Sequence, residues 1–348
     1  MSLQKKLLFW YNDNRRDFPW RKSKDPYKVW LSEIILQQTR AAQGLPYFLK
    51  FENAFPTVQS LAEAEEEEVL KLWQGLGYYS RARNLHFTAQ TIVNEFNGIF
   101  PNDFKKLKSL KGIGDYTASA IGSICFDLPE AVVDGNVYRM LSRIFALSIP
   151  IDSSPAHKVF KNKANLLMKG ASPGEFNQAM MEFGALQCLP RNPNCAECIF
   201  SSECIVYQQG KVNHFPIKSK KIKVRKRFFN YLVLLNSDGK TLIEKRIGAG
   251  IWQNLYQFPL LETNDTNTEI DKNDISSFLN QKGINQIQSV IKYNDLPIIH
   301  KLTHQHLEII FWIVETTDLI GAGVKFGQLD DYPMPKTLQN FREKFFMN

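Results

Sequence analysis

Four of the five cysteines lie close together between residues 188 and 204, in the pattern C-x6-C-x2-C-x5-C. They are Cys188, Cys195, Cys198 and Cys204. Four thiolates at this spacing could surround one structural zinc ion or one [4Fe–4S] cluster. Zinc sites usually carry two C-x2-C pairs, and this segment has one. The spacing therefore favours an iron–sulfur cluster and leaves zinc open.

A second motif is Leu110-Lys111-Gly112-Ile113-Gly114, directly before an expected helix at 115–126. Backbone N–H groups at a helix N-terminus hold phosphate, and glycine allows a nucleic-acid strand to come close. A lone Gly-x-Gly is more often a tight turn, so this motif gains weight only beside other signals.

Two carboxylates have positions suited to acid and charge chemistry. Asp134 follows an extended piece at 131–133 and precedes a helix, so it is expected to cap that helix. A helix N-terminus favours an ionised carboxylate, which could stabilise a developing sugar cation. Glu33 lies among large apolar residues, where burial would raise its pKa toward that of a general acid. The plain alternatives are a cap at Asp134 and a solvated Glu33.

The cysteine spacing and the hairpin, flanked by Leu107 and by Tyr116-Thr117-Ala118, together resemble the endonuclease III superfamily of DNA glycosylases. Within that superfamily, the chain resembles the MutY family. The stretches that carry this resemblance are Phe18-Pro19-Trp20-Arg21, Pro26-Tyr27, Ser32-Glu33 with Leu36 to Thr39, Leu72-Trp73, Gly75 to Tyr79 and Arg81 to Leu85. The resemblance covers nearly the whole chain and is most specific in 15–205.

The resemblance implies an N-terminal all-α helix-hairpin-helix glycosylase fold with a [4Fe–4S] loop at 188–204. It implies a base-excision-repair enzyme that removes adenine opposite 8-oxoguanine or guanine in double-stranded DNA. Glu33 would protonate the adenine, Asp134 would stabilise the sugar cation by charge or covalent capture, and Tyr116 and Asn136 would hold the carboxylates and water. The implied adenine pocket is Arg16, Trp20, Arg21 and Gln178. The implied DNA contacts are Gln38, Thr39, Leu76, Tyr78, Gly112, Gly114, Leu302, Thr303 and His304.

Tyr116 separates two subclasses. Bifunctional relatives carry a lysine two residues after the last hairpin glycine, and its amine forms a Schiff base with the sugar. A phenol forms no imine, so we expect a monofunctional glycosylase that uses water, and Lys111 should not substitute efficiently. The alternatives are an endonuclease III-like glycosylase/lyase for oxidised pyrimidines, a non-catalytic lesion-binding protein, and a zinc-stabilised helical protein.

The elements that must position these residues are mostly helices. Helical patterns are expected at 26–39, 59–74, 81–97, 103–109, 115–126, 135–146, 155–169 and 174–187, with one short strand at 131–133. Asp25-Pro26 is an N-cap followed by proline at the first helical position.

The C-terminal part changes character to α/β. We expect a strand at 228–235, a hairpin turn at Ser237-Asp238-Gly239 with a return strand at 241–245, a loop at 263–274, a helix at 273–282 and a strand at 307–314. Gly250-Ile251-Trp252, Leu255-Tyr256 and Phe258-Pro259 resemble the Nudix-like domain of MutY enzymes. The acidic metal-binding helix of Nudix hydrolases is absent from 262–282, so recognition of 8-oxoguanine is expected. The Phe-Ser-His loop of that family stands here as Leu302-Thr303-His304.

The chain of 348 residues has a net charge of +8 and a pI of about 9.1, which makes a polyanionic partner plausible. Residues 211–227 hold eight Lys and Arg and no acid. They are predicted to link a domain at 1–210 to a domain at 228–348, either as a solvated tether or as a phosphate contact. No apolar run approaches a membrane span. We expect a monomer in the cytoplasm that acts on chromosomal DNA.

Overall fold

A computed structural model describes residues 1–219, 224–263, 270–318 and 323–346. The chain forms two compact units. One contains Met1–Ala64 and Arg83–Lys220, and the other contains Glu65–Ala82 and Lys221–Asn348. Among the described residues, no helix is long and apolar enough to cross a membrane.

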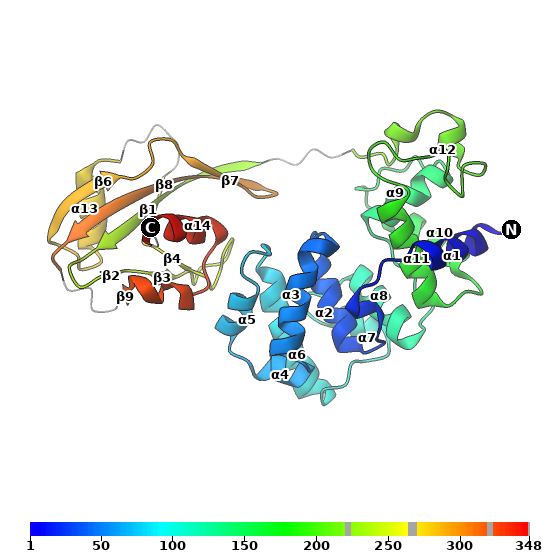
Figure 1. Ribbon diagram of the computed structural model, residues 1–348, viewed down its shortest axis with the longest axis horizontal. Coiled ribbons are helices and arrows are strands. Elements are labelled where there is room, and N and C mark those ends of the chain that lie inside the picture. The colour runs from blue at the N-terminus through cyan, green and yellow to red at the C-terminus, as the bar shows by residue number, and fades with distance from the viewer. Residues whose placement is uncertain (220–223, 264–269, 319–322, 347–348) are drawn as a thin grey trace. The chain divides into compact units, whose positions relative to one another are not determined.

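The first unit is built from helices, as Figure 1 shows. The helices before residue 220 are α1 Leu3–Asn14, α2 Pro26–Leu36, α3 Ala41–Ala54, α4 Val58–Glu63, α5 Glu66–Leu72, α6 Ser80–Phe96, α7 Phe104–Ser109, α8 Asp115–Phe126, α9 Gly135–Ile144, α10 Ala156–Met168, α11 Pro173–Leu186 and α12 Ile205–Gln208, with short 3₁₀ helices η1 Pro19–Arg21 and η2 Val212–His214. Of these, α5 and the start of α6 belong to the second unit. The expectation of an N-terminal all-α fold is confirmed.

Capping residues explain where several helices begin. Asp25 caps α2 by accepting a hydrogen bond of 2.9 Å from the amide of Tyr27. The single helix expected at 59–74 is wrong, because two capping boxes divide it. Thr57 with Ser60 starts α4, and Glu65 with Glu68 starts α5. Each capping box provides hydrogen-bond acceptors for amide groups that have no partner within the helix at its N-terminus.

Three further differences have local causes. Helix α2 ends at Leu36 and not near Thr39, because Gln38 adopts a left-handed backbone with φ 56°. Helix α3 was not expected, since it contains Pro46, which sequence patterns treat as a breaker. Residues 131–133 are not a strand, because the amides of Ala131 and Val132 donate to side chains of α10 and α11.

Aromatic contacts join the helices of the first unit around one core. Trp10 of α1 and Phe183 of α11 meet edge to face with ring centroids 5.0 Å apart. Phe200, from the cysteine segment, meets Phe183 in the same way at 5.0 Å. Such pairs add about 1 kcal/mol each beyond area burial. The segment that carries the cysteines is therefore packed onto the helical core.

The second unit is an α/β domain around a five-stranded sheet in the order β5-β1-β8-β6, with β7 also paired to β8. Its elements after residue 220 are β1 Arg225–Leu235, β2 Lys240–Thr241, β3 Glu244–Lys245, β4 Tyr256–Gln257, β5 Leu260–Thr263, α13 Lys272–Asn280, β6 Ile287–Lys292, β7 Ile298–Lys301, β8 Gln305–Thr316, β9 Val324–Lys325, the 3₁₀ helix η3 Phe326–Asp331 and α14 Lys336–Phe346. Strands β1 and β8 run parallel, and the other pairs are antiparallel. The α/β expectation is confirmed.

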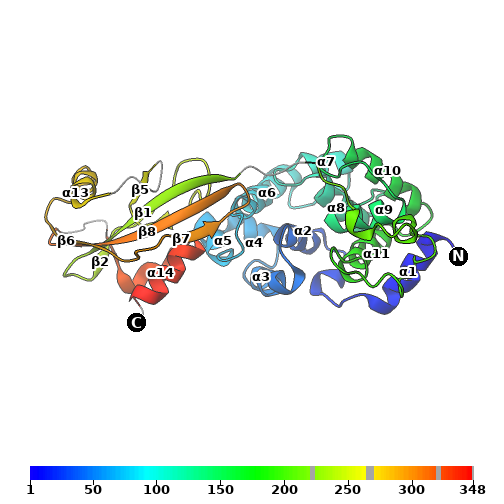
Figure 2. The ribbon, with the colours of Figure 1, turned by 90° about the horizontal axis from the view of Figure 1, so that it is seen from above.

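Helices cover both faces of this sheet, and Figure 2 shows α13 and α14 on opposite sides. Leu232 and Leu234 of β1 pack with α13 on one face. On the other face, the rings of Phe311 and Phe341 stack with centroids 4.0 Å apart. Successive side chains of a strand point to opposite faces of the sheet, so each strand contributes to the hydrophobic core on either side.

The return strand expected at 241–245 does not pair with β1. Both edges of β1 are occupied, by β5 and by β8, so β2 pairs with β9 and β3 pairs with β4. Half of the loop expected at 263–274, residues 264–269, lies outside the described residues, and α13 already begins at Lys272.

The basic segment expected to be a linker is partly a strand. Strand β1 begins at Arg225, and within it Lys226 pairs with Glu308 at 3.0 Å and Arg227 with Glu262 at 2.7 Å. Both cations therefore form ion pairs with neighbouring strands of the sheet. Lys220, Lys221 and Lys223 lie outside the described residues.

Helix α5 is attached to strands and loops of the same unit. Glu67 accepts hydrogen bonds from Lys245 at 2.7 Å and from the Tyr256 hydroxyl at 2.9 Å. Glu66 accepts one from the side-chain amide of Asn254 at 2.6 Å. The chain thus contributes a short early segment, 65–82, to a unit otherwise made from its C-terminal third.

Candidate active site

A cleft in the first unit gathers most of the predicted site residues. Its lining includes Glu33, Asp134, Tyr116, Asn136, Arg16, Trp20, Arg21, Gln178, Gln38 and Thr39. These side chains come from α2, α8, α9, α11 and the segments that flank α2. Residues more than 140 positions apart in sequence therefore share one wall, as the resemblance implied.

Glu33 is buried in the cleft, with 8% of its surface exposed. The pKa of Glu33 is raised to about 7, chiefly by burial and also by the nearby charge of Asp134, while a hydrogen bond from Tyr116 and the charge of Arg21 oppose the shift. Desolvation disfavours the charged carboxylate. Glu33 therefore exchanges its proton near neutral pH, as a general acid must.

Tyr116 lies in the electrostatic field of both carboxylates. Burial, and then the negative charges of Glu33 and Asp134, hold the pKa of Tyr116 well above its usual range. The phenol stays neutral and serves as a hydrogen-bond donor to Glu33. Its oxygen also lies 3.4 Å from the Met181 sulfur, which is a far weaker acceptor than a carboxylate.

Asp134 caps α9, as expected. Its carboxylate accepts hydrogen bonds from the Val137 amide at 2.7 Å and from the side-chain amide of Asn136 at 2.9 Å. Burial raises the pKa of Asp134 and outweighs these hydrogen bonds, which lower it. The helix terminus thus limits a shift that burial would otherwise make larger.

Arg139 was not foreseen from the sequence. Its guanidinium donates to Asn136 Oδ1 at 2.8 Å, to the carbonyl of Gly184 at 2.5 Å and to the carbonyl of Cys188 at 2.6 Å. Asn136 in turn holds Asp134. A chain of hydrogen bonds therefore runs from the Asp134 carboxylate to the first cysteine of the cluster motif. Its sequence signal is an arginine one turn into the helix that Asp134 caps.

Glu182 was also missed, although it lies at the centre of the predicted pocket. Arg16 and Arg21 each bind its carboxylate through two nitrogen atoms, at 2.7 to 3.1 Å. Burial raises the pKa of Glu182, but the hydrogen bonds from Arg16 and Arg21 outweigh it and lower the pKa to about 2. Bidentate pairs of this kind fix orientation. The two arginines are therefore held by Glu182 at the cleft wall.

The other residues of the implied adenine pocket provide aromatic surface and polar groups. Trp20 stacks on Phe18 with ring centroids 4.7 Å apart, and the guanidiniums of Arg16 and Arg21 lie over the Phe18 ring at 5.1 and 5.2 Å. Gln178 accepts a hydrogen bond of 2.7 Å from the Tyr11 hydroxyl. The cleft thus offers flat aromatic surface beside fixed polar groups, which suits a planar heterocycle.

Gln38 and Tyr78 share an unusual backbone. Their φ angles are 56° and 48°, a left-handed conformation that costs a residue with a side chain about 1 kcal/mol or more. Gln38 lies at the cleft of the first unit, and Tyr78 belongs to the second unit. Strain of this kind is common at functional loops, and the sequence does not reveal it.

The predicted contacts of the second unit are only partly brought together. The Tyr78 hydroxyl lies 2.5 Å from the Thr303 hydroxyl, and Tyr78 is 47% exposed. Leu302 and His304 flank Thr303 on an exposed turn between β7 and β8. Leu76 is only 6% exposed, so its side chain offers little surface to a DNA strand.

The hairpin between α7 and α8 has the expected form. Gly112 has φ 79°, a left-handed value that favours glycine. A Cβ atom at Gly114 would meet no other atom within 4 Å, so space is open at the start of α8. The hairpin does not line the cleft and forms a separate surface on the first unit.

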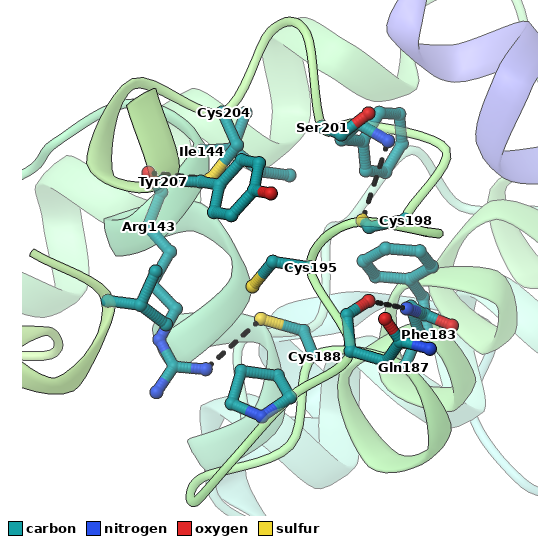
Figure 3. A pocket seen from close by; sticks show the side chains of 14 residues that line it. Arg143, Ile144, Phe183, Gln187, Cys188, Cys195, Cys198, Ser201, Cys204 and Tyr207 are labelled. Carbon is teal, nitrogen blue, oxygen red and sulfur yellow. Dashed lines mark hydrogen bonds between the residues drawn. The ribbon is translucent and has the colours of Figure 1, made fainter. Parts of the chain in front are cut away.

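The four motif cysteines line one small cavity, and Figure 3 shows their sulfur atoms facing the same space. None of them forms a disulfide. Arg143, one helical turn beyond Arg139, donates to Cys188 Sγ at 3.5 Å and to the Leu189 carbonyl at 2.6 Å. Helix α9 therefore contacts both the cleft and the cysteine segment.

Comparison with known proteins agrees with this architecture. Residues 31–164 match the model of the HhH-GPD superfamily of base excision DNA repair proteins, and residues 230–344 match a NUDIX domain. The first unit also resembles the solved structure of a thermostable thymine-DNA glycosylase, with a TM-score of 0.56 and 31% identity over 59% of this chain and 95% of that one. The helical fold and its cleft define a DNA N-glycosylase of the helix-hairpin-helix class.

Two relatives span both parts of the chain. The adenine DNA glycosylase of Buchnera aphidicola subsp. Baizongia pistaciae is 36% identical over 88% of this chain and 85% of its own length. That of the subspecies from Schizaphis graminum is 34% identical over 97% of each chain. The chain therefore belongs to the MutY-type adenine DNA glycosylase family, with its C-terminal Nudix-like domain.

The raised pKa of Glu33 predicts a pH-dependent stability. Its folded pKa of about 7 exceeds the 4.5 of a free Glu, so the folded state binds the proton more tightly. The stabilisation is complete below pH 4.5 and is lost as pH rises to 7, by about 3 kcal/mol. Glu33→Gln removes this loss. We expect the variant to gain stability relative to the wild type between pH 5 and 8 in urea unfolding.

Glu182→Gln is the matched control with the opposite sign. The lowered pKa of Glu182, about 2, stabilises the folded state above pH 4.5, and this is lost as pH falls toward 2. That variant should be less stable than the wild type at neutral pH, with a deficit that shrinks in acid. A stability difference for Glu33→Gln that stays constant with pH would contradict the buried, titrating carboxylate.

Gly184→Ala should damage the site although alanine favours helices. A Cβ atom at Gly184 would lie 2.7 Å from Asn136 Cβ and 2.9 Å from its carbonyl oxygen, so backbone must move. We expect a loss of about 1–3 kcal/mol in unfolding free energy and a slower base release, because Asn136 holds Asp134.

Gly122→Ala in α8 is the control, since its Cβ would meet the flexible end of Leu128 at 3.0 Å. Urea unfolding and single-turnover rates test both variants. Equal behaviour of Gly184→Ala and wild type would mean that this helix contact does not position Asp134.

Proposed function

We propose that this protein removes adenine mispaired with 8-oxoguanine or guanine in double-stranded DNA and leaves an abasic site without cutting the strand. The observation that carries the proposal is the pairing of Glu33 and Asp134 in one cleft beside an aromatic and arginine-lined pocket. The membership of the adenine DNA glycosylase family supports adenine as the base. We further propose that the chain acts as a monomer on chromosomal DNA in the cytoplasm.

The reaction needs the adenine outside the helix. Extrusion costs a few kcal/mol of stacking and pairing, which contacts to the flipped base must offset. Trp20 with Phe18 supplies a stacking surface, and Arg16, Arg21 and Gln178 supply polar groups at the pocket wall. Gln38 is proposed to enter the stack and Thr39 to contact the strand, because both lie at the cleft on a turn that leaves α2.

Glu33 is proposed as the general acid. With a pKa of about 7 it is protonated in a large fraction of molecules near neutral pH and delivers that proton to N7 of the adenine. Protonation makes the base a better leaving group, so the bond to the sugar breaks with cation character on the sugar. Tyr116 orients the Glu33 carboxyl through its hydrogen bond.

Asp134 is proposed to stabilise the sugar cation. Its carboxylate is held by Val137 and Asn136 and needs no rearrangement when positive charge develops. Asp134 can stabilise the cation by its charge or by transient covalent capture. In either case water finally adds to the sugar carbon, and the abasic DNA and free adenine leave. The proton that Glu33 donated is replaced from that water.

The absence of an amine at position 116 supports the monofunctional assignment. A Schiff base needs a primary amine at the sugar, and Tyr116 is instead a partly buried phenol that is hydrogen-bonded to Glu33. The alternative, a glycosylase/lyase for oxidised pyrimidines, would require another lysine near Asp134. The cleft lining contains Arg16, Arg21, Arg40 and Arg139 but no lysine among its described residues.

Recognition of the opposite base is proposed for the second unit. Tyr78 and Thr303 share a hydrogen bond and lie on exposed segments of that unit. A hydroxyl pair can donate to and accept from the groups by which 8-oxoguanine differs from guanine. Leu302 and His304 would contact the strand around it, and the hairpin glycines Gly112 and Gly114 a phosphate.

A [4Fe–4S] cluster is proposed at Cys188, Cys195, Cys198 and Cys204. The four cysteines line one small cavity in the first unit, with their sulfur atoms facing the same space. Zinc would draw all four sulfurs to about 2.3 Å from one point, whereas each cysteine of a cluster binds its own iron. Sulfurs around a shared cavity fit the cluster better. When bound, the cluster would cross-link 188–204, while Arg139 and Arg143 fasten that segment to α9.

Single-turnover release of adenine from an A:8-oxoguanine duplex tests the proposed function. We expect release by the wild type, an intact strand until alkali is added, no product trapped by borohydride, and a rate lowered at least about 10³-fold in Asp134→Asn. The variant keeps the side chain size and its acceptor for Val137, so folding should persist.

Folded, iron-loaded protein that releases no adenine from that duplex would refute the substrate assignment. Release of an oxidised pyrimidine, with a trapped imine, would instead establish the glycosylase/lyase alternative.

Cys198→Ser tests the cluster. We expect purified wild type to contain about four irons per chain, and the variant to lose iron and melt at lower temperature. Cys125→Ser is the control, because Cys125 lies in α8 outside the cysteine segment and should leave the iron unchanged. One zinc per chain in colourless wild type would refute the cluster.

A further inference from the structure

Asp115 occupies a position where a negative charge should hinder DNA binding. It is the first residue of α8 and follows Gly114 of the hairpin directly. The first turn of a helix offers unpaired amide groups that favour anions, and a carboxylate there competes with a phosphate for the same positive end. This proposal rests on the proposed function, in which the hairpin holds a phosphate.

The Asp115 carboxylate contacts two lysine ammonium groups and one histidine ring. Lys161 Nζ lies 2.8 Å from Oδ1, His157 Nε2 lies 3.2 Å from the same oxygen, and Lys108 Nζ lies 3.2 Å from Oδ2. Lys108 is on α7 and the other two are on α10, and both helices lie beside α8 in Figure 2. Burial raises the pKa of Asp115, but the hydrogen bond and charge of Lys161, together with the hydrogen bond from Lys108, outweigh this and lower the pKa. Asp115 is therefore a paired anion.

Lys161 is the centre of this group. Its ammonium also lies 2.9 Å from Glu130, donates a hydrogen bond of 3.2 Å to the Ser119 hydroxyl oxygen, and stands 4.3 Å from the centre of the Phe104 ring. It thus joins both helices of the hairpin to the loop that leads to Asp134. Its side chain is 12% exposed, too little to reach a phosphate itself, whereas that of Lys108 is 50% exposed.

The charge balance depends on Lys161. Asp115 and Glu130 carry two negative charges, and Lys108 and Lys161 carry two positive ones. Without Lys161, a net negative charge remains beside the hairpin. In a partly buried setting such a charge repels a nearby phosphate by an amount worth about tenfold in affinity.

We infer that Lys161 is a positioning residue for DNA binding: it neutralises Asp115 and holds it away from the hairpin amides, so that a backbone phosphate can bind there. Lys161 acts through Asp115 and does not touch the DNA. Lys108, on the exposed side of the same carboxylate, is available to the phosphate directly.

The test is the affinity of the full-length protein for an undamaged duplex, measured by fluorescence anisotropy at several salt concentrations. Lys161→Met should weaken binding about tenfold. Adding Asp115→Asn to that variant should restore the affinity to within about threefold of the wild type, because the uncompensated charge is gone. Asp115→Asn alone should bind at least as tightly as the wild type.

Two controls separate this role from others. Lys163→Met removes a cation from the same helix that stacks on Phe145 and is not bonded to Asp115, so it should change binding little. Lys108→Met should lower the slope of log affinity against log salt by about 0.9, as for a lost phosphate contact. Adding Asp115→Asn to Lys108→Met should not restore that slope.

Three results would overturn the inference. Wild-type affinity in Lys161→Met would show that Asp115 needs no neutralisation. A double variant that stays weak, with a reduced salt slope, would make Lys161 a direct phosphate contact. A double variant that stays weak with an unchanged slope and a lower melting temperature would make its role purely structural. Wild-type protein that binds no duplex would instead refute the proposed function, and with it the basis of the inference.

Discussion

Two carboxylates share one cleft in the first unit, and the surrounding residues must accommodate both their mutual repulsion and their partial loss of solvent. Glu33 meets this constraint by keeping a proton to about pH 7, and Asp134 meets it by accepting hydrogen bonds at the start of α9. Tyr116, which stays neutral, donates a hydrogen bond to Glu33. The cleft therefore holds one group ready to give a proton and another ready to face positive charge, which is the division of roles that breaking an N-glycosidic bond requires.

Helix α9 carries much of this arrangement. Asp134 caps its N-terminus, and Asn136 and Arg139 lie within its first two turns. Near its C-terminal end, Arg143 contacts the cysteine segment. Helix α11 approaches it so closely at Gly184 that only a hydrogen atom fits. Because the same helix contacts both places, a displacement of the cysteine segment would reach Asp134 through two hydrogen-bonded arginine and asparagine side chains.

Much of this could be predicted from the sequence, and the failures have physical causes. Local signals, such as Asp25-Pro26 before α2 or Asp134 before α9, identified helix starts, and the cysteine spacing identified one shared cavity. The split between α4 and α5 was missed because two capping boxes outweigh a continuous apolar pattern. Arg139 and Glu182 were missed because their roles depend on partners far away in the chain, and a single sequence contains no distances. The backbone strain at Gln38 and Tyr78 leaves no mark on residue type.

The early segment 65–82 belongs by its contacts to a unit otherwise formed after residue 220. Its acidic residues Glu66 and Glu67 are satisfied by Asn254, Lys245 and Tyr256. A fragment cut in the basic segment would therefore keep every residue that lines the cleft but would separate α5 from its partners. It would keep α5 but lose what α5 binds, and Tyr78 would lose Thr303. Gene fusions, truncations and domain exchanges in this protein need two junctions in the N-terminal part as well as one in the linker.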